Sequence, residues 1–284
     1  MGYLKLEMSH ISSKLHKISR SMEKKSRYID RERYFNELAQ TSKEFYIDYI
    51  KSCKSAESHS RILEIGCGEG GNLLPFAELG CYVTGLDLAP NKIENAKAFF
   101  AKRGAEGDFR CSNFLTDTPP SDDALYDIIL IHDVIEHIEP EGKEAFFSKV
   151  RLYLKPDGII FFGFPPWQMP FGGHQQICRS RFCKLPFIHL LPAPIYKTWL
   201  KAFKENPSQI EELLSIKRSK MTPESFEKLS IGAGYKIKMR TFWLISPHYK
   251  AKFGLMPRKL CRGLRSIPYL RNFFTTSCFY IIAQ

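Results

Sequence analysis

A glycine-rich turn and one aspartate have types and a spacing that indicate ligand chemistry. The turn, Gly66-x-Gly68-x-x-Gly71, follows a short apolar run and precedes a helical pattern, and Asp87 ends the next apolar run, 21 residues beyond Gly66. Glycines allow a tight turn and a close approach of the backbone to a ligand. A carboxylate at this spacing can accept hydrogen bonds from both hydroxyls of a ribose. The pattern predicts a nucleoside site; the alternative is a tight strand-to-helix turn that binds nothing.

Asp133, His137 and His174 are the residues that could move a proton. All three are expected near the carboxyl ends of strands, where open α/β sheets bind ligands. Such a side chain can act as general base for a group that must lose its proton. For His137 the alternative is packing at the end of a helix, and for His174 it is a loop position in solvent. The eight cysteines include no C-x-x-C pair, so no metal site is expected.

Strands that alternate with helices must position these residues. We predict strands over 61–65, 82–86, 109–111, 126–131 and 159–164, with helices over 72–79, 90–103 and 141–154 between them. This alternation is typical of βαβ units and a parallel sheet. A helix over 223–231 and strands over 235–244 and 273–283 complete the pattern. The expected fold class is α/β, a mostly parallel sheet with helices on both faces.

Three segments fall outside this alternation. Residues 1–57 are polar with one apolar stripe and are expected to form an N-terminal helical extension. Residues 167–221 are rich in proline, aromatic and basic residues and are expected to form a lid or substrate insertion after strand five. Residues 246–272 are a basic insertion before the last strand. The expected domain that contains both insertions spans residues 58–284.

Four short segments resemble those of one enzyme family. Glu64-Ile-Gly66-Cys-Gly68-Glu-Gly70 resembles motif I, E/D-x-G-x-G-x-G, of the class I S-adenosylmethionine-dependent methyltransferases. His132-Asp-Val-Ile-Glu-His137 resembles a segment after strand four of the small-molecule methyltransferases, and Leu154-Lys-Pro-Asp-Gly158 resembles their turn before strand five. The segment around Gly173-His174 resembles the substrate lid of ubiquinone-biosynthesis-like O-methyltransferases. The resemblance is strong over residues 60–165 and extends to 222–284 by layout only.

The resemblance implies a Rossmann-like, seven-stranded sheet with an antiparallel last strand, and a set of residues in contact with the cofactor. That set is Glu64, Gly66, Cys67, Gly68, Gly70, Asp87, Leu88, Asn113, Phe114 and His132. Glu64 would orient the glycine loop or the ammonium group of the cofactor, and Asp87 would bind the ribose. Asn113 and Phe114 would meet the edge and the face of the adenine. For Asn113, where the family often has aspartate, the alternative is a simple turn residue.

The cofactor that the resemblance implies is S-adenosylmethionine, with S-adenosylhomocysteine as product. A dinucleotide site presents a helix N-terminus to a pyrophosphate, whereas S-adenosylmethionine is cationic and suits an acidic loop. The chain is therefore interpreted as a methyltransferase (EC 2.1.1.-) that acts on a small-molecule or lipid-linked acceptor, with an oxygen as the expected methyl acceptor. Two alternatives stay open: an RNA- or membrane-binding module on a vestigial methyltransferase fold, and an NAD-linked oxidoreductase.

The net charge of +12 is distributed unevenly along the chain. Residues 61–173 contain 10 basic and 17 acidic residues, whereas residues 174–284 contain 20 basic and 5 acidic ones. A nucleic-acid coat would be basic throughout, so that class is disfavoured. The basic last third suits an anionic acceptor or an anionic membrane surface, with RNA as the weaker expectation. No secretion signal or membrane-spanning run is visible, so a cytoplasmic location is expected, with peripheral membrane contact through the basic third.

Overall fold

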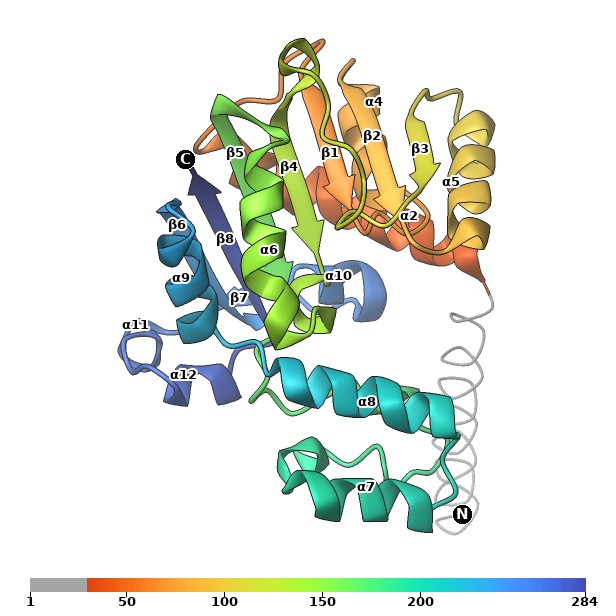
Figure 1. Ribbon diagram of the computed structural model, residues 1–284, viewed down its shortest axis with the longest axis vertical. Helices are drawn as coiled ribbons and strands as arrows, with labels where there is room; N and C mark the ends of the chain where they lie inside the picture. The colour runs from red at the N-terminus through yellow and green to blue at the C-terminus, as the bar shows by residue number, and fades with distance from the viewer. Residues whose placement is uncertain (1–29) are drawn as a thin grey trace, which may run out of the picture.

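An eight-stranded sheet forms the centre of the computed structural model, which describes residues 30–284 (Figure 1). The strand order is β3-β2-β1-β4-β5-β8-β6-β7. The strands are β1 (Arg61–Ile65), β2 (Tyr82–Asp87), β3 (Asp108–Cys111), β4 (Tyr126–His132), β5 (Leu154–Phe164), β6 (Lys236–Ile245), β7 (Arg258–Lys259) and β8 (Ser277–Ala283). The first five strands pair in parallel, and β8 runs antiparallel between β5 and β6.

The α/β class is confirmed, and the strand count differs from the expected seven by one. The additional strand, β7, is a two-residue edge strand inside the basic segment 246–272, and it pairs with β6. Sequence patterns miss it because two residues show no periodicity. The last strand also begins later than predicted: Phe273 and Phe274 lie at the end of a short helix with their side chains largely exposed, and β8 begins at Ser277.

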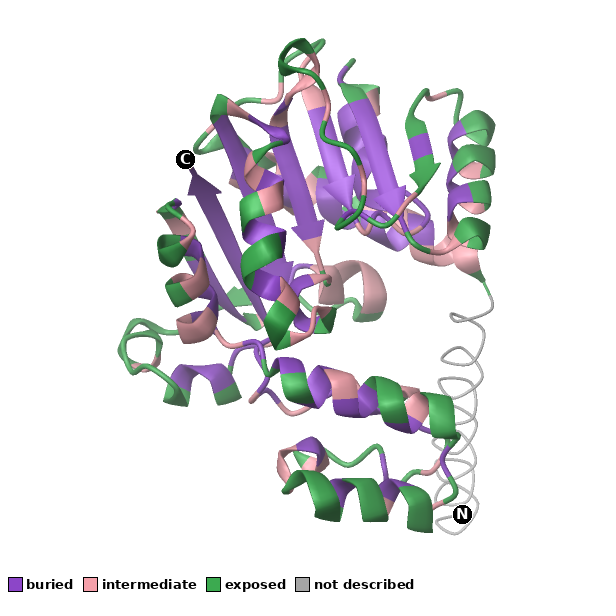
Figure 2. Ribbon diagram, viewed as in Figure 1, coloured by how far each residue is buried: buried purple, intermediate pink, exposed green. Residues whose placement is uncertain are grey.

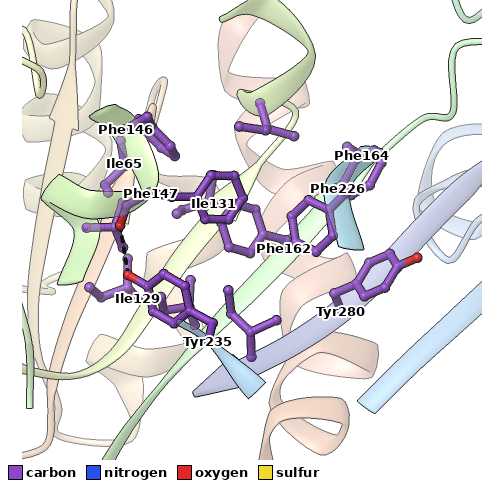
Figure 3. Close-up of a cluster of buried hydrophobic side chains, with 14 of the residues drawn as sticks. Ile65, Ile129, Ile131, Phe146, Phe147, Phe162, Phe164, Phe226, Tyr235 and Tyr280 are labelled. Carbon is purple, nitrogen blue, oxygen red and sulfur yellow. Dashed lines mark hydrogen bonds between the residues drawn. The ribbon is translucent and has the colours of Figure 1, made fainter. Parts of the chain in front are cut away.

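Alternate residues of the central strands are buried on opposite faces of the sheet. On one face, helices α6 (Pro140–Arg151) and α9 (Pro223–Gly232) cover Ile129, Ile131 and Phe162 (Figure 3). On the other face, α2 (Arg31–Thr41), α4 (Leu74–Glu78) and α5 (Pro90–Lys102) cover Ile128 and Leu130. Burial on both faces explains why the strand sequences are near-continuously apolar.

Proline and threonine set the starts of the helices that flank the sheet. Pro90 and Pro223 occupy the first turns of α5 and α9, where a missing backbone N–H costs nothing. Thr222 caps α9: its side chain accepts a hydrogen bond from Ser225 N. The predicted helix at 141–154 is shorter than expected, because β5 begins at Leu154 and includes the turn-like residues that follow it.

The described part of the N-terminal segment packs on the second face of the sheet. Helix α2 continues through a π-helical turn, Ser42–Tyr46, into α3 (Ile47–Lys51). Phe35, Tyr46 and Ile50 are buried in the core on that face. The predicted helical extension over 1–57 lies partly outside the described residues, since residues 1–29 are not among them.

Residues 167–221 contain two helices that the sequence did not predict, α7 (Ala193–Ala202) and α8 (Pro207–Ser219). They lie beyond the carboxyl ends of β1 and β4 and have a separate hydrophobic cluster (Figures 1 and 2). Two prolines of this proline-rich segment lie at helix starts: Pro192 is the N-cap of α7 and Pro207 is the first residue of α8. We call residues 167–221 the lid segment.

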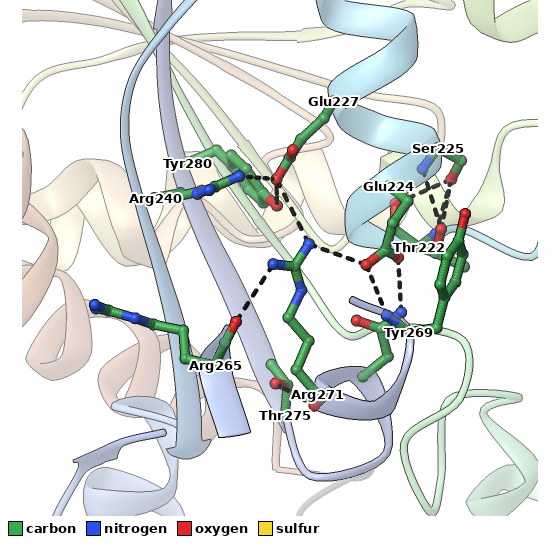
Figure 4. Close-up of polar contacts among 11 residues, drawn as sticks. Thr222, Glu224, Ser225, Glu227, Arg240, Arg265, Tyr269, Arg271, Thr275 and Tyr280 are labelled. Carbon is green, nitrogen blue, oxygen red and sulfur yellow. Dashed lines mark hydrogen bonds and ion pairs between the residues drawn. The ribbon is translucent and has the colours of Figure 1, made fainter. Parts of the chain in front are cut away.

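The basic segment 246–272 contains α10 (His248–Phe253), α11 (Arg262–Arg265) and the start of α12 (Leu270–Phe273), and it is anchored to α9 by one buried arginine (Figure 4). Arg271 Nη2 lies 2.9 Å from Glu224 Oε1, and its guanidinium stacks 4.4 Å from the centre of the Phe242 ring. Asn272 Nδ2 donates to the other oxygen of Glu224 at 2.8 Å. These contacts pair the buried charge of Arg271 with that of Glu224, although Arg271 Nε has no hydrogen-bond partner among residues 30–284.

None of the helices within residues 30–284 has both the length and the apolar character needed to span a membrane.

Candidate active site

The glycine-rich turn after β1 is folded back onto the end of β2. Gly66 N and Cys67 N both donate to Leu86 O, at 2.7 and 3.0 Å, and Gly68 N donates to Asp87 Oδ2 at 2.9 Å. Gly66, Gly68 and Gly70 have φ angles of 74°, 55° and 80°, the left-handed region that favours glycine. The turn therefore presents backbone at the carboxyl edge of the sheet, with Asp87 beside it.

Asp87 is nearly buried, and both its oxygens already accept a backbone hydrogen bond. Oδ2 accepts from Gly68 N, and Oδ1 accepts from Ala89 N at 2.9 Å. Each carboxylate oxygen can accept more than one hydrogen bond. The side chain is thus fixed by the loops on either side of it and keeps lone pairs for a ligand's hydroxyls.

Glu64 on β1 is a buried carboxyl, only 1% exposed, with one unsatisfied oxygen. Its Oε1 accepts from Asn72 Nδ2 at 2.6 Å, while Oε2 has no partner. Burial raises the pKa of Glu64 to about 8, with the charge of Asp87 adding to the rise and the Asn72 hydrogen bond opposing it. A cation bound at the turn would favour the ionised carboxylate, so this site fits a positively charged ligand better than an anionic one.

The three residues expected around the adenine have different environments. Leu88 is 70% exposed and projects from the end of β2. Asn113 is exposed, and its Oδ1 accepts from Leu115 N at 3.1 Å, which closes a local turn and leaves the amide nitrogen uncommitted. Phe114 is buried in the core, with its ring centre 4.9 Å from that of Tyr153. Phe114 thus fills space in the core beside α6.

His132, at the end of β4, is held by a residue that sequence reasoning did not connect to the site. Tyr46 OH lies 2.8 Å from His132 Nε2, and His132 Nδ1 lies 3.4 Å from Asp133 Oδ2. Tyr46 ends the π-helical turn, a feature often found at functional sites. Sequence periodicity identified Tyr46 only as part of an apolar stripe, and nothing local to it indicates a partner 86 residues away.

The three candidate bases gather beside the carboxyl ends of β4 and β5, together with Glu136. The rings of His137 and His174 are nearly perpendicular, with centres 4.9 Å apart, and His174 Nε2 lies 3.8 Å from Glu136 Oε1. Glu136 is buried, and neither of its carboxyl oxygens has a hydrogen-bond partner in the described part of the chain. Sequence reasoning missed Glu136, although it lies inside the H-D-V-I-E-H motif. One ligand atom each from Glu136, His137 and His174 lie within 4.8 Å of one another, close enough that a metal ion could be held there.

Burial determines the protonation of this cluster. It lowers the pKa of His174 to about 4, with the nearby His137 lowering it further, and it also lowers the pKa of His137. Burial raises the pKa of Glu136 well above its usual value, and the charge of Asp133 adds to this. Both imidazoles are therefore neutral at pH 7 and can accept a proton.

Comparisons with known proteins find similarity to methyltransferases. A family model described as "Methyltransferase domain" matches residues 62–158. The ubiquinone biosynthesis O-methyltransferase of Rhodopseudomonas palustris (strain HaA2) is 36% identical over 106 residues, which are 37% of this chain and 40% of that protein. The same enzyme of Bradyrhizobium sp. (strain ORS 278) is 35% identical over 100 residues, 35% of this chain and 38% of that one. The aligned part is thus less than half the length of these curated relatives.

Solved structures share the fold over most of the chain. An S-adenosylmethionine-dependent methyltransferase from Clostridium acetobutylicum aligns with a TM-score of 0.55 at 12% identity, covering 86% of this chain and 91% of that one. Magnesium protoporphyrin IX methyltransferase from Synechocystis PCC 6803, solved with bound SAH, aligns with a TM-score of 0.53 at 13% identity, covering 87% and 83%.

The chain has the Rossmann-like fold of the class I S-adenosylmethionine-dependent methyltransferases. Within it, residues 62–158, which carry the glycine-rich turn and the H-D-V-I-E-H segment, are similar to the methyltransferase domain.

We predict that Gly66→Ala destabilises the protein more than Gly104→Ala does. Both glycines have positive φ, but a Cβ on Gly66 would overlap Val134 Cγ2, whereas a Cβ on Gly104 meets no atom within 4 Å. The left-handed conformation costs about 1–2 kcal/mol at either position, and the overlap adds to that cost at Gly66 alone. Urea unfolding of the two variants measures the difference. Equal losses would show that the turn does not pack against Val134.

We predict that His174→Asn reduces the loss of stability on acidification. Folded His174 stays neutral down to about pH 4, while the unfolded residue is protonated near pH 6.5, so the unfolded state binds more protons between these values. Stability from this group is present above pH 6.5 and lost as the pH falls toward 4. Urea unfolding at pH 7.5 and pH 5 should show a smaller drop for the variant, by up to about 2 kcal/mol. His59→Asn is the matched control, since His59 is exposed and also has positive φ; a drop equal to wild type in His174→Asn contradicts the prediction.

Proposed function

We propose that this chain is an S-adenosylmethionine-dependent methyltransferase that transfers a methyl group to an oxygen of a small-molecule or lipid-linked acceptor. The observation that carries the proposal is the pairing of a glycine turn with two acidic groups at one edge of the sheet: Asp87 hydrogen-bonds the turn, and Glu64 is buried beneath it with an oxygen free.

The residues around the turn suit the two ends of this cofactor. Asp87 would bind the ribose hydroxyls, and the exposed side chain of Leu88 would flank the adenine. The ammonium group of the cofactor would be a positively charged partner for the buried carboxylate of Glu64. His132, held by Tyr46, would lie at the methionine end. Bound there, S-adenosylmethionine supplies an activated methyl group.

The imidazole cluster suits an acceptor that must lose a proton. The neutral His174 or His137 would take the hydroxyl proton as the oxygen attacks the methyl carbon, and the negative charge of Asp133 would stabilise the imidazolium that forms. The lid segment, which carries His174, would hold the acceptor in line with the methyl group and exclude water. The anionic pyrophosphate of a nicotinamide dinucleotide suits this acidic turn less well than the cationic cofactor does.

We predict that Asp87→Ala abolishes S-adenosylmethionine binding. Loss of the carboxylate removes both the ribose acceptor and the hydrogen bonds that hold the turn, so isothermal titration should show at least a 100-fold weaker Kd, about 2.7 kcal/mol. Asp122→Ala, an exposed acid away from the turn, should bind as wild type does. Binding that survives Asp87→Ala would overturn the cofactor assignment, and tight NADH binding by the wild type would favour the oxidoreductase alternative.

In the same preparations, methyl transfer from labelled cofactor to extracted lipid and small-molecule fractions tests the reaction. His174→Asn should keep cofactor binding and lower the rate by about 10²–10⁴, the usual contribution of a general base. An unchanged rate would remove His174 from the mechanism while leaving the cofactor assignment intact.

We also propose that the protein contacts an anionic membrane surface, which would give it access to a lipid-linked acceptor. The lid segment carries exposed apolar side chains, and so do the basic segment and the two phenylalanines that follow it. The two groups meet where Phe187 and Phe273 approach, with ring centres 6.3 Å apart. The exposed large apolar residues of the lid segment are Phe182, Leu185, Phe187 and Ile195, and those of residues 246–274 are Phe253, Leu255, Met256, Ile267, Tyr269, Leu270, Phe273 and Phe274. Arg262 and Arg265 are on α11 in the same segment. Apolar side chains mixed with arginine are typical of interfacial binding.

We predict that the protein co-sediments with phosphatidylglycerol vesicles and not with pure phosphatidylcholine vesicles. Ile267→Ser with Leu270→Ser should weaken this binding by about 30-fold or more, since each change removes roughly 1–2 kcal/mol of apolar burial in the interface. The control, Ile231→Ser with Leu152→Ser, changes two residues outside both segments that are more exposed than the two test residues. Equal binding of both double variants would contradict the proposed surface.

A further inference from the structure

The lid segment contains a second group of chemistry-bearing side chains, separate from the candidate active site. Cys178, Cys183 and Glu205 are all buried, and the two Sγ atoms and a carboxylate oxygen lie within 4.8 Å of one another. Cys178 and Cys183 flank a short turn, and Glu205 lies in the connection between α7 and α8. The proposed function uses none of them.

The Glu205 carboxylate has hydrogen bonds but no counter-charge. Its two oxygens accept from Arg179 N and Ser180 N, at 2.8 and 2.7 Å. Within residues 30–284, no lysine, arginine or histidine nitrogen lies within 4.0 Å of this carboxylate. A buried charge in proteins is ordinarily paired or bound to a metal.

The lid segment also contains a buried hydroxyl without a hydrogen-bond partner in the described part of the chain, that of Tyr196. This side chain is fully buried on α7, and its OH has no hydrogen-bond partner among residues 30–284. Tyr196 belongs to the same buried cluster as Cys178 and Cys183, together with Leu200, Ile210, Leu213 and Leu214. An unsatisfied hydroxyl thus lies in the apolar cluster that contains the two thiols.

We propose that Cys178, Cys183 and Glu205 form a structural zinc site in the lid segment, with Tyr196 OH or a water molecule at the fourth position. Zn²⁺ prefers thiolate ligands in tetrahedral geometry with Zn–S bonds of about 2.3 Å, which separates two sulfur ligands by about 3.8 Å. The ligand atoms of the three residues lie within 4.8 Å of one another, which is compatible with this separation. Two thiolates with one carboxylate are a softer set than Mg²⁺ or Ca²⁺ takes, so zinc is the fitting ion.

The chemistry of binding is a proton exchange with no redox step. Two S–H bonds break, two Zn–S bonds form, and two protons go to solvent. Without a cation, burial keeps both thiols protonated by raising the pKa of Cys178 to about 12 and that of Cys183 to about 11. A divalent cation reverses this preference.

A zinc ion here would fasten the 178–183 turn to the α7–α8 connection. The hydrophobic cluster of the lid segment is small and separate from the two clusters of the sheet, and small cores usually need a disulfide or a metal for stability. The metal would therefore act on the lid as a structural staple, independently of whether the cofactor assignment is correct.

The test is elemental analysis of the full chain. The protein is purified without chelator, dialysed against excess ZnCl₂ and then dialysed against a metal-free buffer. We expect one zinc per chain, lost in Cys178→Ser with Cys183→Ser. Cys81→Ser with Cys278→Ser, two buried cysteines outside the lid segment, is the matched control and should keep the metal. Glu205→Gln keeps both thiols and should weaken zinc affinity by at least tenfold, so the proposal stays testable if the double variant does not fold.

Cobalt substitution distinguishes this site from the Glu136, His137 and His174 cluster. Co²⁺ bound to Cys178 and Cys183 should give thiolate-to-cobalt charge-transfer absorption that survives His137→Ala with His174→Ala. Metal bound without that absorption overturns the proposal. So does a metal-free chain after dialysis, whether a thiol titration then finds all eight cysteines free or finds two of them lost to a disulfide between Cys178 and Cys183.

Discussion

The hydrogen bond from Gly68 N to the Asp87 carboxylate, with the two bonds from Gly66 N and Cys67 N to Leu86 O, is the constraint on which the site depends. These bonds fold the turn after β1 onto the end of β2, which is possible only because the two strands are parallel neighbours. A turn held in this way exposes its backbone at the carboxyl edge of the sheet and leaves Glu64 beneath it. The cofactor proposal follows from that one arrangement.

The burial of ionisable side chains is the second physical feature on which the site depends. Glu64, Glu136, His137 and His174 are all shielded from water near the same edge of the sheet, and burial drives each of them toward its neutral form. Perturbed ionisable groups gathered in this way are typical of catalytic sites. Their cost in stability is offset by the large apolar clusters on both faces of the sheet, where most of the central strand residues are inaccessible.

The lid and basic segments are elaborations built at one end of this common core. Each of the two segments is held by polar contacts of its own. The basic segment is held by the ion pair between Arg271 and Glu224, and the lid segment by the hydrogen bonds of the Glu205 carboxylate. Phe187 of the lid segment contacts Phe273, which directly follows the basic segment. In the function that we propose, the acidic core would bind the cationic cofactor, and the basic, partly apolar end would meet an anionic or membrane-borne partner.

The sequence by itself determined the parallel core and the turn, because strand, glycine turn and helix are local patterns with a period that can be read from the chain. It also marked Asp87, Asp133, His137 and His174, since each follows a predicted strand. Only the tertiary structure decided which distant residues meet. Tyr46 reaches His132, Glu136 joins the two imidazoles, Phe114 turns into the core, and Cys178, Cys183 and Glu205 converge. The sequence missed α7 and α8 because prolines at helix starts look the same as prolines that break a helix. Contacts of this kind depend on chain folding over tens of residues, and no local periodicity encodes them.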